Sequence, residues 1–211
     1  TTAQEILRAT DGEVDAFVPF SAAGAQVPGD ITATADGGFA ATYRNNAATS
    51  EPGAQQVGII NALGGVDIEL MILDSKLKPL RRHRLGSASN DDAHSLARLA
   101  NGDLLIAGVA LNVAPMLMRV SADGTLLWQH VFKAYIVPYW ARYRVQVQSD
   151  GMAVLAGYVP ETSSLAHSAL WRFDLDGNLL SSQIDSGKAS NQLNGFTFMP
   201  DTTLLAVGEI Q

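Results

Sequence analysis

The chain has 211 residues and a formal charge of −7, and its 47% hydrophobic content is sufficient for a sizeable core. The acidic balance argues against a nucleic-acid partner, which would require a basic surface. The absence of cysteine excludes disulfides and thiolate metal sites, and no apolar run approaches the roughly 18 residues of a membrane span. A cysteine-free chain rich in Gly, Ala, Thr and Asn is typical of bacterial export, so we expect a secreted, cell-surface or periplasmic protein.

The first predicted element is a hairpin within residues 1–25. Asp11-Gly12 separates two runs of the segment QEILRATDGEVDAFVPF, residues 4–20. Asp-Gly and Asn-Gly between β-rich runs are the strongest short-range hairpin signal, and they predict type I′ turns in which both central residues have positive φ. The order Leu7-Arg8 before Asp-Gly parallels Met118-Arg119 and Trp171-Arg172 before later Asp-Gly pairs. We therefore expect this segment to be the second half of a repeat unit.

A complete unit of four strands is predicted over residues 26–92. Its runs are ITATA, FAATYR, VDIELMILDS and KPLRRHRL. This copy carries about sixteen extra residues, which we place within Asn45–Gly65. The polar, turn-rich part NNAATSEPGAQQ predicts an exposed loop, and the apolar GIINALGG that follows is expected to fold back on a neighbour.

Two further units, residues 93–140 and 141–191, repeat the same order of strands and turns, and residues 192–211 resemble the first half of a unit. Four antiparallel strands are predicted in residues 93–132, around Asn101-Gly102 and Asp123-Gly124. Two sets of positions measure the period. The glycines Gly108, Gly157 and Gly208 are 49 and 51 residues apart, and the aspartates Asp74, Asp123 and Asp176 are 49 and 53 apart.

A period near fifty with four strands per unit is typical of one blade of a β-propeller. We predict an all-β fold, a β-propeller of about four four-stranded blades, whose ring is closed by the half blades 1–25 and 192–211. Closure would remove the exposed sheet edges at both ends of the chain. Two alternatives stay open: the chain is part of a larger propeller, or its terminal strands pair with another chain.

The repeat resembles the pyrroloquinoline-quinone-like (PQQ-like) repeats of bacterial secreted propellers. The residues that carry the resemblance are Asp36–Phe39, Asp67–Asp74, Arg84–Asp92, Arg119–Trp128 and Trp171–Leu180. Such families share an architecture and include adhesion, sensing, scaffold and enzyme modules, so the resemblance implies a fold and no single activity. The ring of cofactor ligands found in true quinoprotein enzymes is not recognisable in this sequence, and we expect no cofactor.

An aromatic stretch in the link before the third complete unit is the strongest binding candidate. Its members are Tyr135, Tyr139, Trp140 and Tyr143, within FKAYIVPYWARY. Exposed aromatic rings bury a large area at a small entropy cost, and sugars stack on them. The alternative is packing between blades, the role that we expect for Trp128 and Trp171.

An acidic cluster in another link, Asn90, Asp91 and Asp92, is a candidate calcium site because hard cations bind several loop oxygens. The alternative is a solvated turn. The four histidines occupy unrelated positions of the repeat: His83 and His130 on last strands, His94 on a first strand and His167 on a third strand. None has the spacing of a metal site.

A basic run lies on the last strand of the first complete unit, and its members are Lys76, Lys78, Arg81, Arg82, His83 and Arg84. We interpret it as protection of an outermost edge strand against pairing. A docking patch for an anionic partner or glycan is the alternative.

The function that these patterns favour is a non-catalytic extracellular module. It would bind a glycan or protein surface through links such as 134–142 and 45–65, or act as a scaffold. The alternative is an enzyme, either a fragment of a quinoprotein-like dehydrogenase or a polysaccharide hydrolase or lyase. Its site would lie in the central channel, with Arg98, Arg144 and Gln146 supplied by first strands.

Overall fold

The computed structural model describes residues 27–45, 55–60, 65–111, 114–132, 141–148, 153–160, 166–185, 191–199, 201 and 203–210. These ranges hold strands, turns and links, which confirms the predicted all-β class. Within them, no helix has the length and hydropathy that crossing a membrane requires. The predicted N-terminal hairpin, residues 4–20, lies outside the described residues.

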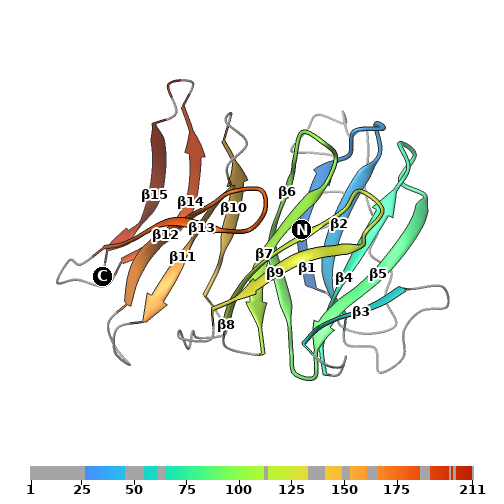
Figure 1. The fold of residues 1–211 in the computed structure, drawn as a ribbon, viewed down its shortest axis with the longest axis horizontal. Coiled ribbons are helices and arrows are strands. Elements are labelled where there is room, and N and C mark those ends of the chain that lie inside the picture. The colour runs from blue at the N-terminus through green and yellow to red at the C-terminus, as the bar shows by residue number, and fades with distance from the viewer. Residues whose placement is uncertain are drawn as a thin grey trace, which may run out of the picture.

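The strands form four sheets that follow one another along the long axis of the molecule (Figure 1). Sheet 1 has the order β1-β2-β4-β5-β3, and its strands are β1 (Val27–Ala33), β2 (Phe39–Asn45), β3 (Gln55–Ile60), β4 (Asp67–Leu73) and β5 (Pro79–Ser87). Sheet 2 consists of β6 (Asp92–Arg98), β7 (Leu104–Ala110), β8 (Ala114–Val120) and β9 (Leu126–Val131). Sheet 3 consists of β10 (Arg144–Val147), β11 (Ala153–Pro160), β12 (Ala166–Phe173) and β13 (Leu179–Ile184), and sheet 4 of β14 (Asn191–Phe198) and β15 (Leu204–Ile210).

The order of strands repeats from sheet to sheet. In sheet 2, each strand pairs antiparallel with the next, which confirms the four antiparallel strands predicted in residues 93–132. Sheet 3 has the same order and pairing. Sheet 4 has the two strands that are predicted for the half unit of residues 192–211.

The predicted loop Asn45–Gly65 contains a strand that the sequence did not reveal. β3 pairs in parallel with β5, from Gln55 opposite His83 to Ile60 opposite Ser87. The prediction of β5 as the outermost edge strand is therefore wrong for this half of the strand. A parallel pair needs a long crossover connection and leaves no hairpin signal in the sequence, so nothing marked β3 as the partner of β5.

The hairpin turns differ from the predicted type I′ form. Each turn has five residues and two backbone hydrogen bonds. The N–H of the first residue donates to the carbonyl of the fifth, and the carbonyl of the first residue accepts the N–H of the fourth. These turns are Thr34–Gly38, Asp74–Lys78, Leu99–Asp103, Ser121–Thr125 and Asp174–Asn178. Only the fourth residue has positive φ: 82° at Gly37, 64° at Leu77, 93° at Gly102 and Gly124, and 89° at Gly177. This is a type I turn followed by a G1 bulge. The type I′ prediction is wrong because the residue before glycine keeps negative φ.

Aspartate side chains hold these turns. In the last turn of sheet 3, Asp174 accepts from the backbone N–H groups of Asp176 and Asn178. Hydrogen bonding lowers the pKa of several turn carboxyls, chiefly through a side-chain donor for Asp36, Asp123 and Asp174 and through the backbone N–H of Thr203 for Asp201. Turn geometry accounts for these aspartates.

The turns also correct one of the two sequence alignments. Asp74 occupies the first turn position together with Ser121 and Asp174, and so does not match Asp123 and Asp176. Leu77 takes the place of the turn glycine. Two of the second-strand glycines leave space for a neighbour: a Cβ at Gly108 would overlap the carbonyl oxygen of Asp92, and a Cβ at Gly157 would overlap the Tyr143 ring.

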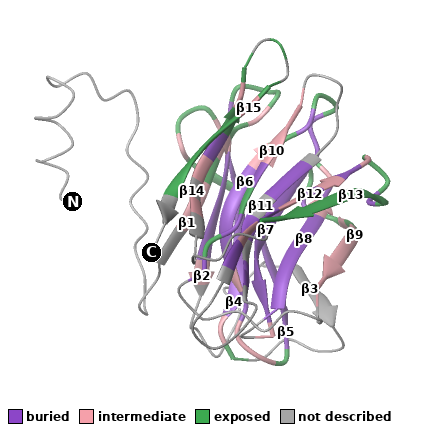
Figure 2. Cartoon of the chain, turned by 90° about the vertical axis from the view of Figure 1, so that its left-hand side faces the viewer, coloured by how far each residue is buried: buried purple, intermediate pink, exposed green. Residues whose placement is uncertain are grey.

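Neighbouring sheets pack face to face on apolar side chains. Between sheets 1 and 2 the buried core includes Ile68, Leu70, Leu96, Ile106 and Met118, and between sheets 2 and 3 it includes Leu105, Leu117, Tyr143, Leu155, Trp171 and Phe173. Trp128 packs against the second cluster, so the predicted packing role of Trp128 and Trp171 is confirmed. Figure 2 shows buried residues concentrated on β4, β7 and β8 and exposed residues on β13 and β15.

One contact recurs between neighbouring sheets. The last strand of one sheet carries a histidine beneath the turn glycine of the next: His83 of β5 lies under Gly124, and His130 of β9 contacts the carbonyl oxygen of Gly177. In the second case the Trp128 Nε1–H also donates to the Leu175 carbonyl, at 3.0 Å. The third-to-fourth-strand turns of sheets 2 and 3 are therefore each seated on the last strand of the preceding sheet. We call this arrangement the turn seat.

Replacement of the seated glycine is predicted to destabilise the protein more than replacement of an unseated one. Gly124→Ala adds a Cβ that overlaps the His83 ring, whereas Gly37, also at positive φ, has no atom within 4 Å of its built Cβ. Gly37→Ala should lower the free energy of unfolding by about 1–2 kcal/mol through backbone strain. Gly124→Ala should cost about 1–3 kcal/mol more because of overpacking. Equal losses in urea denaturation would contradict the turn seat.

A second prediction concerns pH. Burial, opposed in part by Asp123 and assisted by Arg81, lowers the pKa of the His83 imidazole below its ordinary value of about 6.5. The unfolded chain then binds this proton at higher pH than the folded chain, so stability is complete above about pH 6.5 and falls as the solution becomes more acidic. His83→Gln should flatten the free energy of unfolding between pH 7 and 5, measured by urea titration. Parallel pH profiles for wild type and variant would contradict it.

Candidate functional site

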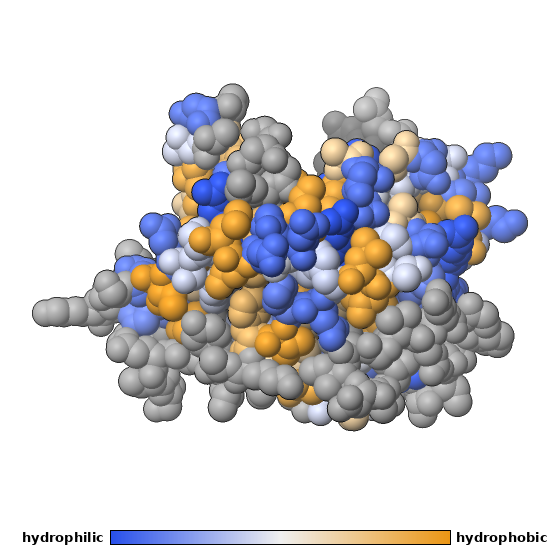
Figure 3. Space-filling view, viewed as in Figure 1, coloured by the Kyte–Doolittle hydropathy of each residue, from blue (hydrophilic) through white to orange (hydrophobic). Residues whose placement is uncertain are grey.

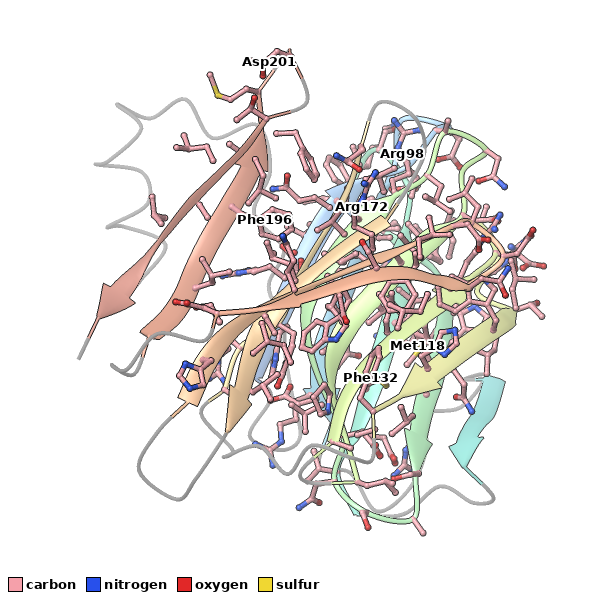
Figure 4. The ribbon with its side chains drawn as sticks, turned by 60° about the vertical axis from the view of Figure 1, so that its left-hand side comes forward. Arg98, Met118, Phe132, Arg172, Phe196 and Asp201 are labelled. Carbon is pink, nitrogen blue, oxygen red and sulfur yellow. The ribbon has the colours of Figure 1, made fainter. Side chains whose placement is uncertain are left out.

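The first strands of all four sheets line one cavity of about 550 Å³. β1, β6, β10 and β14 each contribute residues, the polar ones being Asp30, Thr32, Ser95, Arg98, Arg144 and Gln146. Arg98 of β6 and Phe196 of β14, both labelled in Figure 4, come from separate sheets to this cavity. The expectation that Arg98, Arg144 and Gln146 come together from first strands is confirmed.

Side-to-side hydrogen bonds hold the first strands together. The Leu96 N–H donates to the Asp30 carboxylate at 2.9 Å, and the Val145 N–H donates to the Ser95 hydroxyl at 3.3 Å. The Gln146 side-chain amide then donates to the Phe196 carbonyl at 2.6 Å. The last two bonds join residues 50 apart and the first joins residues 66 apart, a difference that equals the extra residues predicted in the first unit.

Irregular pairing at the start of the first strands frees groups for these bonds. The register shifts between Pro28 and Ile31 in β1, between Ala93 and Ser95 in β6, and between Leu193 and Gly195 in β14. A bulge leaves a residue without its ladder partner and redirects the neighbouring side chains. The strands therefore bond sideways at the cavity while their remaining lengths pair within each sheet.

The cavity carries more positive than negative charge. Both Arg98 and Arg144 are exposed, and the Arg144 Nη1 donates to the His94 carbonyl at 3.3 Å. Neither forms an ion pair with another described residue. The Asp30 carboxylate accepts the N–H groups of Ile31 and Leu96, so its oxygens are already bonded to the backbone.

These groups suit an anionic ligand. A guanidinium offers a planar pair of donors that matches a carboxylate, sulfate or phosphate. The Gln146 amide and the Ser95 hydroxyl add neutral polar groups, and the largely buried Phe196 supplies an apolar wall. Two guanidinium groups, neutral polar groups and an apolar wall therefore share one cavity of about 550 Å³.

Of the predicted aromatic platform, Tyr135, Tyr139 and Trp140 lie outside the described residues. Tyr143 lies in the core between sheets 2 and 3, where it is fully buried. Its ring stacks on His94, with ring centroids 6.2 Å apart, and fills the space left by Gly157. The alternative role, packing between sheets, therefore describes Tyr143. A link position immediately before a first strand leads into the core, which the aromatic composition alone did not indicate.

The predicted calcium cluster uses its oxygens inside the protein. Asn90 accepts the Val66 N–H, and the buried Asp91 carboxylate accepts the N–H groups of Ser87 and Leu111 and the Ser87 hydroxyl. Burial raises the pKa of Asp91, opposed by these bonds. Asp92 lies near His94, with Oδ2 3.6 Å from Nε2. Among the described residues, no three His, Cys, Asp or Glu side chains gather as a metal site.

The basic run is divided by the alternation of β5. Arg84 is buried and donates to Asp67 from Nε at 2.6 Å, and Arg82 lies 3.5 Å from Glu69. Lys76 and Lys78 belong to the exposed turn before the strand, and Arg81 is exposed beside them. The continuous surface patch of the docking alternative is therefore reduced to these three side chains.

No family model matches this chain, and a search of curated proteins found no match. The function is therefore argued from the site itself.

The Asp91 network gives a test that separates a structural link from a metal site. Asp91→Ala leaves the buried N–H of Ser87 and the partly buried N–H of Leu111 without their acceptor and should lower the free energy of unfolding by about 2–3 kcal/mol. Asp92→Ala, which removes a partly exposed carboxyl, is the matched control and should cost much less. Wild-type melting temperature should be the same in EDTA and in calcium. A calcium-dependent rise that Asp91→Ala abolishes would contradict the structural role.

Proposed function

We propose that this chain is a non-catalytic binding module in which the sheets are arranged radially, as blades of a β-propeller, around a ligand cavity. The observation that carries the proposal is that one cavity is lined by residues of all four described first strands. Side-to-side bonds between residues 50 apart support the radial arrangement because each sheet stands in the same relation to the next. The resemblance to PQQ-like repeats of secreted bacterial propellers agrees with this architecture.

The ligand that the cavity fits is an acidic glycan, presented outside the cell. Arg98 and Arg144 provide two guanidinium groups, and the Asp30 carboxylate between the strands is engaged with backbone N–H groups. A uronic acid offers carboxylates to the arginines and hydroxyls to Gln146 and Ser95. The link that contains Tyr139 and Trp140 would extend the site, as the sequence predicts, and it lies outside the described residues.

An enzyme that uses the same cavity is the alternative proposal. It would employ Arg98, Arg144 and Gln146 to hold a polysaccharide or a cofactor. General acid–base catalysis requires a carboxyl group that reaches the substrate, and Asp30 is the single carboxylate among the described lining residues. Its two backbone hydrogen bonds favour a role in joining β1 to β6, so the observations favour binding.

The test is isothermal titration calorimetry with trigalacturonate, and with cellotriose as the neutral comparison. Arg98→Ala and Arg144→Ala should each weaken trigalacturonate binding at least about tenfold, or about 1.4 kcal/mol, and added salt should weaken it further. Arg81→Ala, which removes an exposed arginine from β5, is the matched control and should leave affinity unchanged. Absence of trigalacturonate binding, or equal losses in all three variants, would contradict an acidic-glycan site in this cavity.

A further inference from the structure

Sheet 3 has positions that correspond to the turn seat, and no turn of the described residues is seated on them. In sheet 2 the seat consists of Trp128 and His130 on β9 and Arg119 on β8, and it holds the turn Asp174–Asn178 of sheet 3. Counted from the last residue of the preceding turn, Thr125 or Asn178, Ser181 occupies the position of Trp128 and Gln183 the position of His130. The cross-strand pairs agree: Arg119 lies opposite Trp128, and Arg172 lies opposite Ser181.

This third seat opens into a groove. Arg172, Ser181 and Gln183 line a cavity of about 140 Å³ together with Phe198 and Leu204 of sheet 4. Arg172, labelled in Figure 4, therefore lies on the side of sheet 3 that faces the β14–β15 hairpin. Sheet 4 has two strands where sheets 2 and 3 have four, so no third-to-fourth-strand turn from the described residues reaches the seat.

The β14–β15 hairpin also exposes side chains that are buried in the other sheets. With Gly208 placed on Gly108, Leu205 corresponds to Leu105 and Val207 to Ala107. Leu105 and Ala107 are fully buried, whereas Leu205 and Val207 are 53% and 61% exposed. Hydrophobic areas interrupt the surface over sheets 3 and 4 in Figure 3. β15 pairs with β14 along one edge, and no described strand pairs with its other edge.

Sheet 1 has a complementary feature at the other end of the described chain. Ala41, Tyr43, Met71 and Leu73 form a separate cluster on the face of sheet 1 opposite to the one that packs on sheet 2. All four are buried, with at most 7% exposure. The described sheets pack on the other face of sheet 1, so this cluster also requires a covering element.

We infer that the seat of Arg172, Ser181 and Gln183 is the docking site of residues 4–20 of this chain, which add two strands to the open edge of β15. Alternation of strand direction sets the first added strand antiparallel to β15, and the added turn then lies at the same end as the turn that joins β14 to β15. On sheet 2, the seat is occupied by Asp176-Gly177 from the turn of sheet 3. On sheet 3, Asp11-Gly12 would occupy the corresponding seat, with Gly12 over Gln183.

Chain length identifies the occupant. Two strands and a turn need about 15–17 residues, and of the segments outside the described residues only 1–26 is that long. A six-residue link, 21–26, would join the added strands to β1, and the link between β13 and β14 is equally long. A second copy of this chain could instead pair its own β15 antiparallel with the β15 of the first copy. The β14–β15 turn of the second copy would then lie at the end of the sheet that is away from the seat.

The test uses the absence of natural cysteines. In the full chain carrying Asp11→Cys and Gln183→Cys, a short bismaleimide should form an intrachain cross-link at high dilution, identified by peptide mass. The matched control, Asp11→Cys with Thr125→Cys on the exposed turn of sheet 2, should not cross-link. Interchain cross-links would assign the seat to another copy. Absence of cross-linking while both thiols react with a simple maleimide would overturn the inference.

Hydrogen exchange of the unmodified chain provides a second measurement that does not depend on variants. If residues 4–20 pair with β15, the β15 amides directed away from β14 should exchange within about tenfold of those bonded to β14, because both sets are then in ladders. If these outward amides exchange as fast as those of an open edge, the inference is wrong. Neither measurement involves the cavity ligand, so its outcome is independent of the proposed function.

Discussion

The contact on which this structure depends most is the seating of a glycine turn on the last strand of the preceding sheet. Glycine at positive φ serves two purposes at Gly124 and Gly177: it permits the G1 bulge, and it leaves room for the imidazole beneath. A side chain there would overlap the ring, so turn geometry and sheet packing are satisfied by the same residue. The contact also fixes register, because a shift of one residue along β9 would present Gln129 in place of His130.

The seating of the turns on the last strands also positions the first strands of neighbouring sheets. With neighbouring sheets held at their outer ends and by the apolar faces between them, the first strands approach one another at the cavity and form hydrogen bonds side to side. Bulges in β1, β6 and β14 supply the irregular pairing that such bonds need. The cavity is therefore a consequence of the packing between sheets.

The sequence predicted features that short-range rules control. Strand order, hairpin positions and the packing of Trp128 and Trp171 follow from hydrophobic alternation, turn residues and the repeat. The repeat also predicted that Arg98, Arg144 and Gln146 lie together on first strands, and they line the same cavity. Features decided by distant neighbours were missed. The parallel partner of β5 leaves no local pattern, Leu77 adopts a positive φ without being glycine, and Tyr143 is buried because sheet 2 covers it. The Asp91 network likewise depends on Leu111, 20 residues away.

The distribution of arginines links the fold to its proposed role. Two guanidinium groups on third and last strands are bonded to carboxylates of the same sheet: Arg84 to Asp67 and Arg119 to Asp103. On the first strands, Arg98 and Arg144 have no such carboxylate among the described residues, although the chain as a whole is acidic. Exposed cations that lie close together repel each other unless an anion is bound between them. Two arginines without a carboxylate partner in the described part of the chain therefore line the same cavity, which is the arrangement that the proposed acidic ligand requires.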